Sequence, residues 1–324
     1  MKVNRVERHQ IKKSHPMFKV CDDYCFKSKN LYNYANFFIR QSFIKESYFI
    51  GYHEMWKLMK IEQPFKDIGS NSGQHTLKIL ERNWKSYFVA IKDYKKSPHK
   101  YLGRPQLPKY LDKENGRFIW VMTNVQSKVI DGELVFSFKV AKPFNGLIKT
   151  KIQGKHMQTR IIPKGDYYIL EIVYEIEISD TFAEPNRILG IDLGLNNLIT
   201  TQNNFNEKPF VINGKPIKSM NSYYNKQVAI IKSKLKKVND KNWSNKLARL
   251  TIKRNNKIDS YMHNATRWIV SYCLAMKVDT VVVGKNKKWK QRLKMKNFVQ
   301  VPFERLIEQL EYKLMENGIK TILT

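Results

Sequence analysis

Residues 187–201 read RILGIDLGLNNLITT, the stretch most informative about the fold. An apolar run delivers one carboxylate, Asp192, and Gly194 then permits a tight turn. Cleavage of a phosphodiester by two metal ions needs several carboxylates that converge on ions roughly 3.5–4 Å apart. A strand that ends on an acid is one way to present the first of these carboxylates. The rest of the chain would have to supply the others.

The pattern that follows predicts an α/β domain over residues 183–324. The expected elements are strands at 188–192, about 197–202 and about 209–213, a helical pair over 215–277, a strand at 279–283, a helix at 303–316 and a strand at 320–323. Three hairpinned strands followed by alternating helix and strand form the order of an RNase H-like fold. In such a sheet, the residue that ends strand 279–283 lies beside the one that carries Asp192. That residue is Gly284, which can neither bind a metal nor accept a proton.

The first half of the chain predicts two further parts. Residues 21–99 follow a helical period, whereas residues 1–20 and 100–182 favour short strands of period two. We expect those strands to form a small β-barrel into which the helices are inserted. The expected strands are Val3–Ile11, Phe118–Met122, Leu134–Val140, Gly146–Ile152, Met157–Ile162 and Tyr167–Ile178. The predicted fold class is therefore α+β with several domains.

The charge of the chain indicates a polyanionic partner. It holds 59 Lys and Arg against 28 Asp and Glu, a net charge of +31, with 12% aromatic residues. This balance favours a nucleic acid over a membrane surface. The sequence shows no apolar run of membrane-spanning length and no signal peptide. Three cysteines favour a reducing compartment, so we expect a cytoplasmic, nucleoid-associated protein, and Cys21 and Cys25 lack a second pair for zinc.

Two segments concentrate this charge. Between Lys215 and Lys257 there are 13 Lys or Arg and one acid, too uneven for a helical hairpin that merely faces solvent. Between Lys285 and Lys296 there are seven basic residues and no acid. Trp289, within the second segment, could stack on a base or anchor the loop to the core. The predicted phosphate contacts are Lys232, Lys234, Lys236, Lys237, Arg254, Lys285, Lys287, Lys288, Lys290 and Arg292.

Five motifs occur in an order that resembles the TnpB family of transposon-encoded, RNA-guided DNA nucleases, related to type V CRISPR effectors. They are SKNLYNYANFFIRQS at 28–42, NWKSYF at 83–88, GRPQLPKY at 103–110, GIDLGLNNL at 190–198 and WKQ at 289–291. The resemblance covers essentially the whole chain. It implies a wedge domain for the barrel, a recognition lobe for the helices and a RuvC domain for the last part. It also suggests Tyr32, Arg40, Lys109 and Tyr110 as further nucleic-acid contacts.

The chain departs from the family where the nuclease needs acids. The resemblance implies a Glu after strand 279–283 or just after WKQ, but these positions hold Gly284 and Arg292. The zinc ribbon and the final catalytic Asp of the family would lie beyond Thr324, so the RuvC domain is expected to be truncated. The sequence is therefore similar to the nuclease-dead TnpB-like repressors. The expectation is a protein that is not an enzyme, with Asp192 as a remnant and no functional magnesium or zinc site.

These observations predict an RNA-guided DNA-binding protein. A guide RNA would pair with one strand of a double-stranded DNA target beside a short flanking motif, and occupancy of that target would repress transcription. The first alternative is an active nuclease completed by a separate C-terminal piece. The others are an inert relic of a transposon gene and a basic DNA-binding protein that needs no guide.

Overall fold

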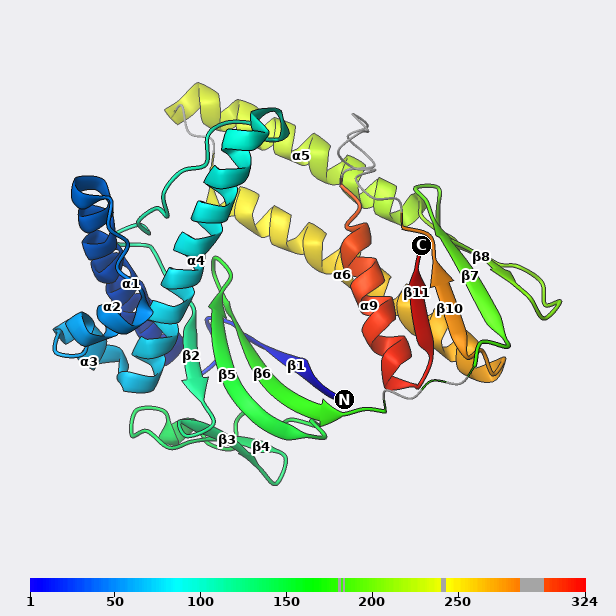
Figure 1. Cartoon of the computed structure of the whole chain (residues 1–324), viewed down its shortest axis with the longest axis horizontal. Helices are drawn as coiled ribbons and strands as arrows, with labels where there is room; N and C mark the ends of the chain where they lie inside the picture. Colours follow the sequence, from blue (N-terminus) through cyan, green and yellow to red (C-terminus); the bar gives the residue numbers. More distant parts are fainter. Residues whose placement is uncertain (180–181, 183, 240–242, 286–299) are drawn as a thin grey trace. The chain divides into compact units, whose positions relative to one another are not determined.

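The computed structural model divides the chain into two compact units (Figure 1). One unit holds Met1–Lys2 and Glu177–Thr324, and the other holds Val3–Ile176. The structure describes residues 1–179, 182, 184–239, 243–285 and 300–324. The mixture of α and β structure expected from the sequence is confirmed.

The C-terminal unit is built on a five-stranded sheet with the order β11-β10-β7-β8-β9. Its strands are β7 (Ile188–Leu193), β8 (Asn197–Asn203), β9 (Val211–Asn213), β10 (Thr280–Val283) and β11 (Lys320–Leu323). Strands β7, β8 and β9 pair antiparallel through short connections. Strand β10 runs parallel to β7 on one side and to β11 on the other. Strand β7 lies in the centre of the sheet, with β10 beside it as the sequence predicted.

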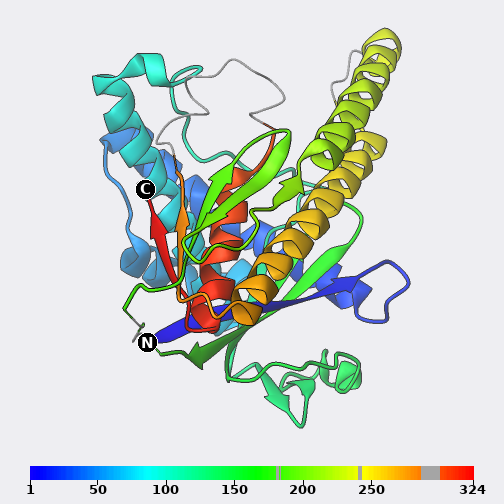
Figure 2. The same ribbon diagram turned by 90° about the vertical axis from the view of Figure 1, so that its right-hand side faces the viewer.

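Helices cover this sheet. They are α5 (Lys215–Asn239), α6 (Asn245–Ala275) and α9 (Phe303–Glu316). Helix α6 begins where the Ser244 side chain accepts a hydrogen bond from the Leu247 amide at 3.2 Å. Apolar side chains of α6 and α9 share one core with β7 and β10. Helices α5 and α6 form a long hairpin, visible in Figure 2 as two adjacent helices.

The other unit begins with β1 (Lys2–Ile11) and continues into four helices: α1 (Phe18–Glu46), α2 (Tyr52–Met59), α3 (Gln63–Ile68) and α4 (Ser70–Lys96). Helices α1 and α4 pack against each other through aromatic side chains, including Phe43 against Trp84 at 5.4 Å between ring centroids. Trp84 is fully buried, and its indole nitrogen donates to Asn36 Oδ1 at 2.9 Å. The buried indole therefore has the polar partner that it needs.

Two separate β structures complete this unit. A four-stranded sheet has the order β1-β6-β5-β2, formed with β2 (Trp120–Thr123), β5 (Lys155–Pro163) and β6 (Tyr168–Glu177). A hairpin of β3 (Ser127–Ile130) and β4 (Glu133–Phe136) turns at Asp131 and Gly132, both with positive φ, as a two-residue turn requires. The short helices η1 (Pro98–Lys100) and η2 (Lys142–Phe144) lie between these elements.

The described strands differ from the expected barrel, because they form a four-stranded sheet and a separate hairpin, and β3 was not among the expected strands. The predicted strand Gly146–Ile152 is absent from the described elements, and only Lys149 forms an isolated bridge, to Glu133. Residue Gly146 has φ of 81°, a left-handed conformation that interrupts a strand. The Asn145 side chain before it accepts a hydrogen bond from the Phe136 amide at 2.8 Å. Local turn chemistry therefore replaces the alternating pattern that suggested a strand.

Candidate nucleic-acid interface

Asp192 lies near the end of the central strand β7, and its side chain is exposed. The Gly284 amide donates to the Ile191 carbonyl at 2.9 Å, which continues the β7–β10 register and sets position 284 beside Asp192. A Cβ atom on residue 284 would lie 3.9 Å from Asp192 Oδ1 and 3.6 Å from the Ile191 oxygen. Both distances are ordinary contacts, so a side chain would fit here. The expected pairing of these two positions is therefore present in the sheet.

Asp279, at the other end of β10, has a structural role. Its carboxylate accepts hydrogen bonds from the Arg187 amide at 2.7 Å and the Asn186 amide at 3.2 Å. Burial alone would raise the pKa of Asp279, but these backbone donors outweigh it and the pKa is lowered. These hydrogen bonds of the carboxylate link the start of β7 to the start of β10. Five residues of extended strand, roughly 15 Å, separate it from Gly284.

The described residues do not assemble the ligands of a two-metal centre. No group of three or more His, Cys, Asp or Glu that could hold a metal ion occurs within residues 1–179, 182, 184–239, 243–285 and 300–324. Asp192 supplies one carboxylate, and a magnesium ion held by one carboxylate keeps most of its waters. The three cysteines are free and buried, and burial raises the pKa of Cys21 and Cys273 to about 12.

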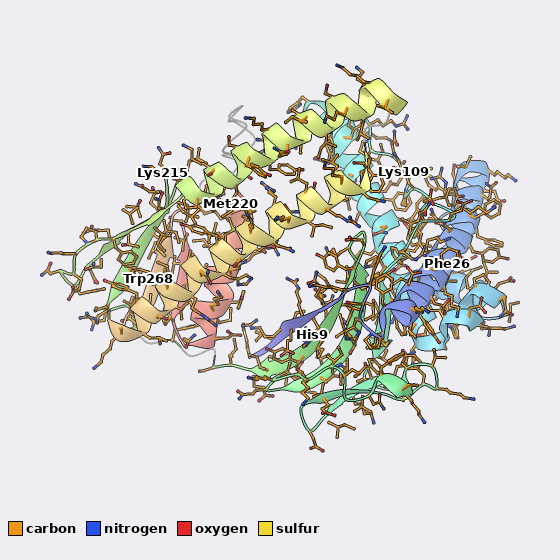
Figure 3. The ribbon with its side chains drawn as sticks, turned by 180° about the vertical axis from the view of Figure 1, so that it is seen from behind. His9, Phe26, Lys109, Lys215, Met220 and Trp268 are labelled. Carbon is orange, nitrogen blue, oxygen red and sulfur yellow. The ribbon has the colours of Figure 1, made fainter. Side chains whose placement is uncertain are left out.

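The predicted lysines of α5 lie on its exposed surface. Ile231 is 9% exposed, while the lysines around it are exposed. These four residues are Lys232, Lys234, Lys236 and Lys237. Figure 3 shows the start of the same helix at Lys215 and Met220. These four exposed cations, which we call the lysine row, precede Asp240, the one acid between Lys215 and Lys257.

Arg254 on α6 differs from these lysines because its guanidinium is already bound within the unit. Its Nε donates to Asn221 Oδ1 at 2.8 Å, and its Nη2 donates to the Gln300 carbonyl at 3.0 Å. The ring of Tyr224 lies beneath it at 5.5 Å, and burial lowers the pKa of the guanidinium. These contacts tie α5 and α6 to the segment before α9, so Arg254 supports the hairpin.

The second basic segment is largely outside the described residues. Lys285 is described, and its Nζ forms an ion pair with Glu304 at 2.8 Å, which raises the pKa of the lysine. The predicted contacts Lys287, Lys288, Trp289, Lys290 and Arg292 lie among residues 286–299. They stay predictions.

The remaining predicted contacts meet on one side of α1. Residues 106–117, which we call the strap, contain no helix or strand and lie along this helix. Arg40 donates to the Pro108 carbonyl at 3.0 Å and lies over the Tyr110 ring at 5.1 Å. Tyr32 is 4% exposed, with its ring 4.5 Å from that of Phe118, so it is mainly a core residue.

A groove of about 430 Å³ runs beside the strap. Tyr32, Asn83 and Tyr87 line it from α1 and α4, and Gln106 and Lys109 line it from the strap side. Lys109 is exposed, and Figure 3 labels it. The groove therefore combines aromatic faces, amide groups and a cation, which are the groups that contact nucleotides in single-stranded sites.

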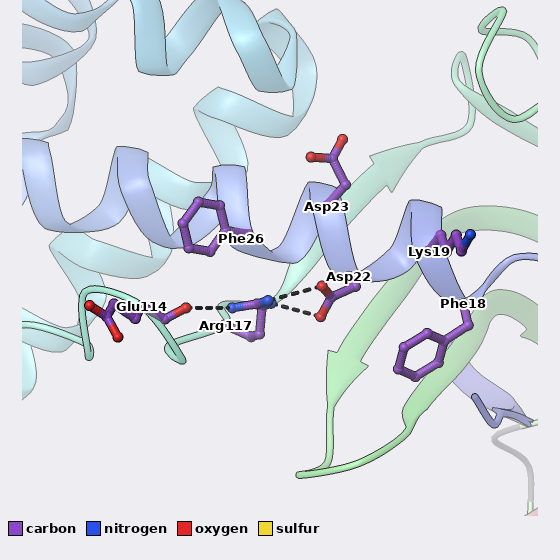
Figure 4. Close-up of a pocket in the computed structure, with 7 residues that line it drawn as sticks. All are labelled: Phe18, Lys19, Asp22, Asp23, Phe26, Glu114 and Arg117. Atoms are coloured by element: carbon purple, nitrogen blue, oxygen red, sulfur yellow. Dashed lines mark hydrogen bonds and ion pairs between the residues drawn. The ribbon is translucent and has the colours of Figure 1, made fainter.

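Sequence reasoning missed the hydrogen bonds that hold the strap. Asn33 bridges both backbone atoms of Leu111, at 2.8 and 2.9 Å, and Asn36 donates to the Pro108 carbonyl at 3.0 Å. At the other end, Arg117 binds both carboxylate oxygens of Asp22, at 2.8 and 2.9 Å (Figure 4). The signal was present in the sequence as polar residues at helical spacing within an otherwise apolar helix face.

Known proteins resemble this chain in sequence and in fold. Residues 171–290, which include β7, Asp192 and the α5–α6 hairpin, match the family model OrfB_IS605, described as a probable transposase. Over these residues the sequence matches the TnpB family. A cryo-EM structure of a Cas12f1–sgRNA–target DNA complex aligns with a TM-score of 0.53 at 14% identity, covering 94% of this chain and 72% of that chain. At this identity the likeness shows a shared fold.

Two further comparisons add little. A cryo-EM structure of a CRISPR–Cas12f ternary complex covers 94% of this chain and 70% of that chain at 11% identity, with a TM-score of 0.36. No curated protein matches the sequence significantly. Among the described residues, no helix is long and apolar enough to cross a membrane.

The family assignment corrects one expectation. The prediction that this protein is not an enzyme is wrong, because the family model that it matches is described as a probable transposase. The substitutions expected to remove activity, at Gly284 and Arg292, do not establish its loss. Gly284 is described beside Asp192, and Arg292 lies outside the described residues.

Proposed function

We propose that this TnpB-family protein binds a guide RNA and uses it to bind double-stranded DNA of matching sequence. The DNA would carry a short flanking motif, as in RNA-guided effectors. The exposed lysine row of α5 is the observation that carries the proposal, because such a row neutralises phosphates without reading bases. The similar Cas12f1 structure, which contains an sgRNA and target DNA, supports the same pair of partners.

Occupancy of the target is the step through which we propose that the protein represses transcription. A stable RNA–DNA hybrid on a promoter obstructs polymerase without any chemical step. The DNA target would also place the protein at the nucleoid. This role depends on how long the complex stays bound, which the phosphate contacts of the lysine row would govern.

The retained Asp192 favours a second candidate function, RNA-guided cleavage of the bound DNA. Its exposed carboxylate at the end of β7 stands where a phosphodiester nuclease presents its first acid. Because the described residues provide one such carboxylate, the other ligands would have to come from outside them. Purified, RNA-loaded protein and its Asp192→Ala variant, incubated with matching DNA and Mg²⁺, separate the two candidates by the presence or absence of Asp192-dependent cleavage.

The proposed binding is tested by the RNA that accompanies the protein. The full chain is purified from cells that express its own flanking DNA, and the bound RNA is sequenced. We expect one defined small RNA with a segment that matches a DNA site elsewhere. A random mixture of cellular RNA, released evenly as salt is raised, would support guide-independent binding and contradict the proposal.

A further inference from the structure

Side chains of helix α1 hold the strap in its conformation. Its backbone makes no helix or strand, so its polar groups need other partners. Side chains of α1 provide them. The Lys29 Nζ donates to the Lys113 carbonyl at 2.6 Å, Asn33 bridges the amide and carbonyl of Leu111, and Asn36 and Arg40 both donate to the Pro108 carbonyl.

These residues form a single stripe. Asp22, Lys29, Asn33, Asn36 and Arg40 follow one another by seven, four, three and four positions, which places them on one face of an α-helix. Two residues of the stripe are buried although they are polar: Lys29 is 2% exposed and Asn36 is fully buried. These buried polar side chains are tolerated because the strap backbone forms hydrogen bonds with them. The same hydrogen bonds hold the strap in one conformation.

The two ends of the strap are fixed most firmly. At Pro108, two donors from α1 share one carbonyl, and Asn36 is in turn held by the indole of Trp84. At the other end, Arg117 donates to Asp22 through Nε and Nη2. Its Nη1 donates to the Glu114 and Gly116 carbonyls, and Figure 4 shows the bonds to Asp22 and Glu114. The Arg117 contact lowers the pKa of Asp22.

The residues between the fixed backbone positions face outward. Lys109 and Tyr110 follow Pro108 directly and precede Leu111, whose backbone is bridged by Asn33. Lys109 is exposed, and Tyr110 is 45% exposed, with its ring covered on one side by Arg40. A cation and an aromatic ring are thus displayed from a backbone that cannot rearrange freely. Such order, established before binding, spares a ligand the entropic cost of imposing it.

We propose that the strap is a preorganised phosphodiester-binding segment, in which Lys109 and Tyr110 contact nucleic acid and Asn33 is the positioning residue that holds them. This inference rests on the proposed function, because it assumes that the protein binds RNA or DNA. It assigns Arg40 to the same positioning role. The chemistry recognised is a phosphate for Lys109 and a base or sugar face for Tyr110.

The dependence of affinity on salt tests this inference. Each phosphate contact contributes about 0.9 to the slope of log Kobs against log salt concentration for duplex DNA, and about 0.7 for single strands. Binding of the full chain is measured by anisotropy with a fluorescein-labelled DNA duplex and, separately, a labelled single-stranded RNA. The variant Lys109→Ala should lower the slope by about one contact on one of these probes, which identifies the strand that the strap binds.

The decisive variant is Asn33→Ala, which removes no charge. If Asn33 positions Lys109, this neutral change lowers the same slope by a similar amount, and the double variant Asn33→Ala/Lys109→Ala shows no further loss. Lys232→Ala, in the other unit, combines additively with Asn33→Ala. Asn30→Ala is the matched control, because Asn30 lies one turn earlier on α1 and makes no side-chain hydrogen bond among the described residues.

Three results would overturn the inference. They are an unchanged slope in Asn33→Ala, full additivity of Asn33→Ala with Lys109→Ala, and an unchanged slope in Lys109→Ala with both probes. Thermal unfolding confirms that each variant is folded, and Asn33→Ser, which cannot bridge both atoms of Leu111, replaces Asn33→Ala if that variant does not fold. Failure of the wild-type chain to bind either probe would refute the proposed function instead, so the two failures are distinguishable.

Discussion

A carboxylate placed at position 284 should create a divalent metal site with Asp192. A Cβ on residue 284 would lie 3.9 Å from Asp192 Oδ1, and neither the local contacts nor the backbone opposes a side chain. The variant Gly284→Glu therefore brings two carboxylates into the reach of one ion. Manganese or magnesium ions take such oxygen ligands.

The expected magnitude follows from charge and binding. Without metal, two unit charges about 5 Å apart interact by about 1 kcal/mol in water and about 3 kcal/mol at an effective dielectric constant of 20. Because Asp192 is exposed, the lower figure applies, and Gly284→Glu should be slightly less stable than wild type. Manganese at about ten times its dissociation constant should then stabilise the variant by about 1.4 kcal/mol. For a unit of this size, that raises Tm by roughly 3–6 °C.

Thermal unfolding with and without Mn²⁺ measures this shift. Gly284→Gln is the matched control, since it has the same shape and no charge, and Gly284→Glu/Asp192→Asn removes the second ligand. Only Gly284→Glu should respond to the ion. A response that persists in the double variant, or equal responses in the Glu and Gln variants, would refute the adjacency of positions 192 and 284 as the basis of the site.

Three further outcomes are expected. Replacing Lys232, Lys234, Lys236 and Lys237 by Gln should lower the salt slope of duplex DNA binding by up to about 3.6. The same change at four exposed lysines of the other unit should leave the slope nearly unchanged; these are Lys128, Lys139, Lys142 and Lys149. Equal losses of slope would argue against a specific role for α5. The thiols of Cys21, Cys25 and Cys273 should not react with a thiol reagent at pH 8 until the protein unfolds, because burial raises their pKa values. Rapid reaction of the folded protein with the reagent would contradict this. Asp22→Asn should lower the urea midpoint of unfolding at pH 7 and flatten the decline of that midpoint below about pH 4. The pKa of Asp22 is lowered in the folded protein, so its carboxylate stabilises the fold above the unfolded pKa and loses this effect as pH falls through the folded pKa. An unchanged decline would count against the Asp22–Arg117 contact.

The C-terminal sheet could be predicted from sequence because its strands are short, β-branched and regularly spaced. Helix α9 and strand β11 begin and end where the apolar period predicted. The strands of the first half of the chain were harder to predict. The hairpin strand Ser127–Ile130 has little alternation, and Gly146 breaks a stretch that otherwise resembles a strand. On α5, Val228, Ile231, Leu235 and Val238 follow one another at steps of three and four, yet Val238 is 75% exposed, so the apolar face is shorter than this spacing predicts.

Some features of the candidate site could likewise be predicted from sequence, and others could not. The adjacency of Asp192 and Gly284 follows from strand order, which sequence reveals. The internal bonds of Arg254 do not, because charge alone cannot distinguish a guanidinium that faces a phosphate from one that binds Asn221 and a backbone carbonyl. Nor could the hold of α1 on the strap be foreseen, since it joins residues about seventy to eighty positions apart whose pairing depends on the tertiary fold.

A change of guide RNA tests RNA-guided recognition directly. The full chain is loaded with its own small RNA or with one in which only the segment that matches the target is replaced, and binding to both DNA duplexes is measured at one salt concentration. Binding should move to the duplex that matches the new segment. Equal binding of both duplexes with either RNA, or with none, would contradict RNA-guided recognition.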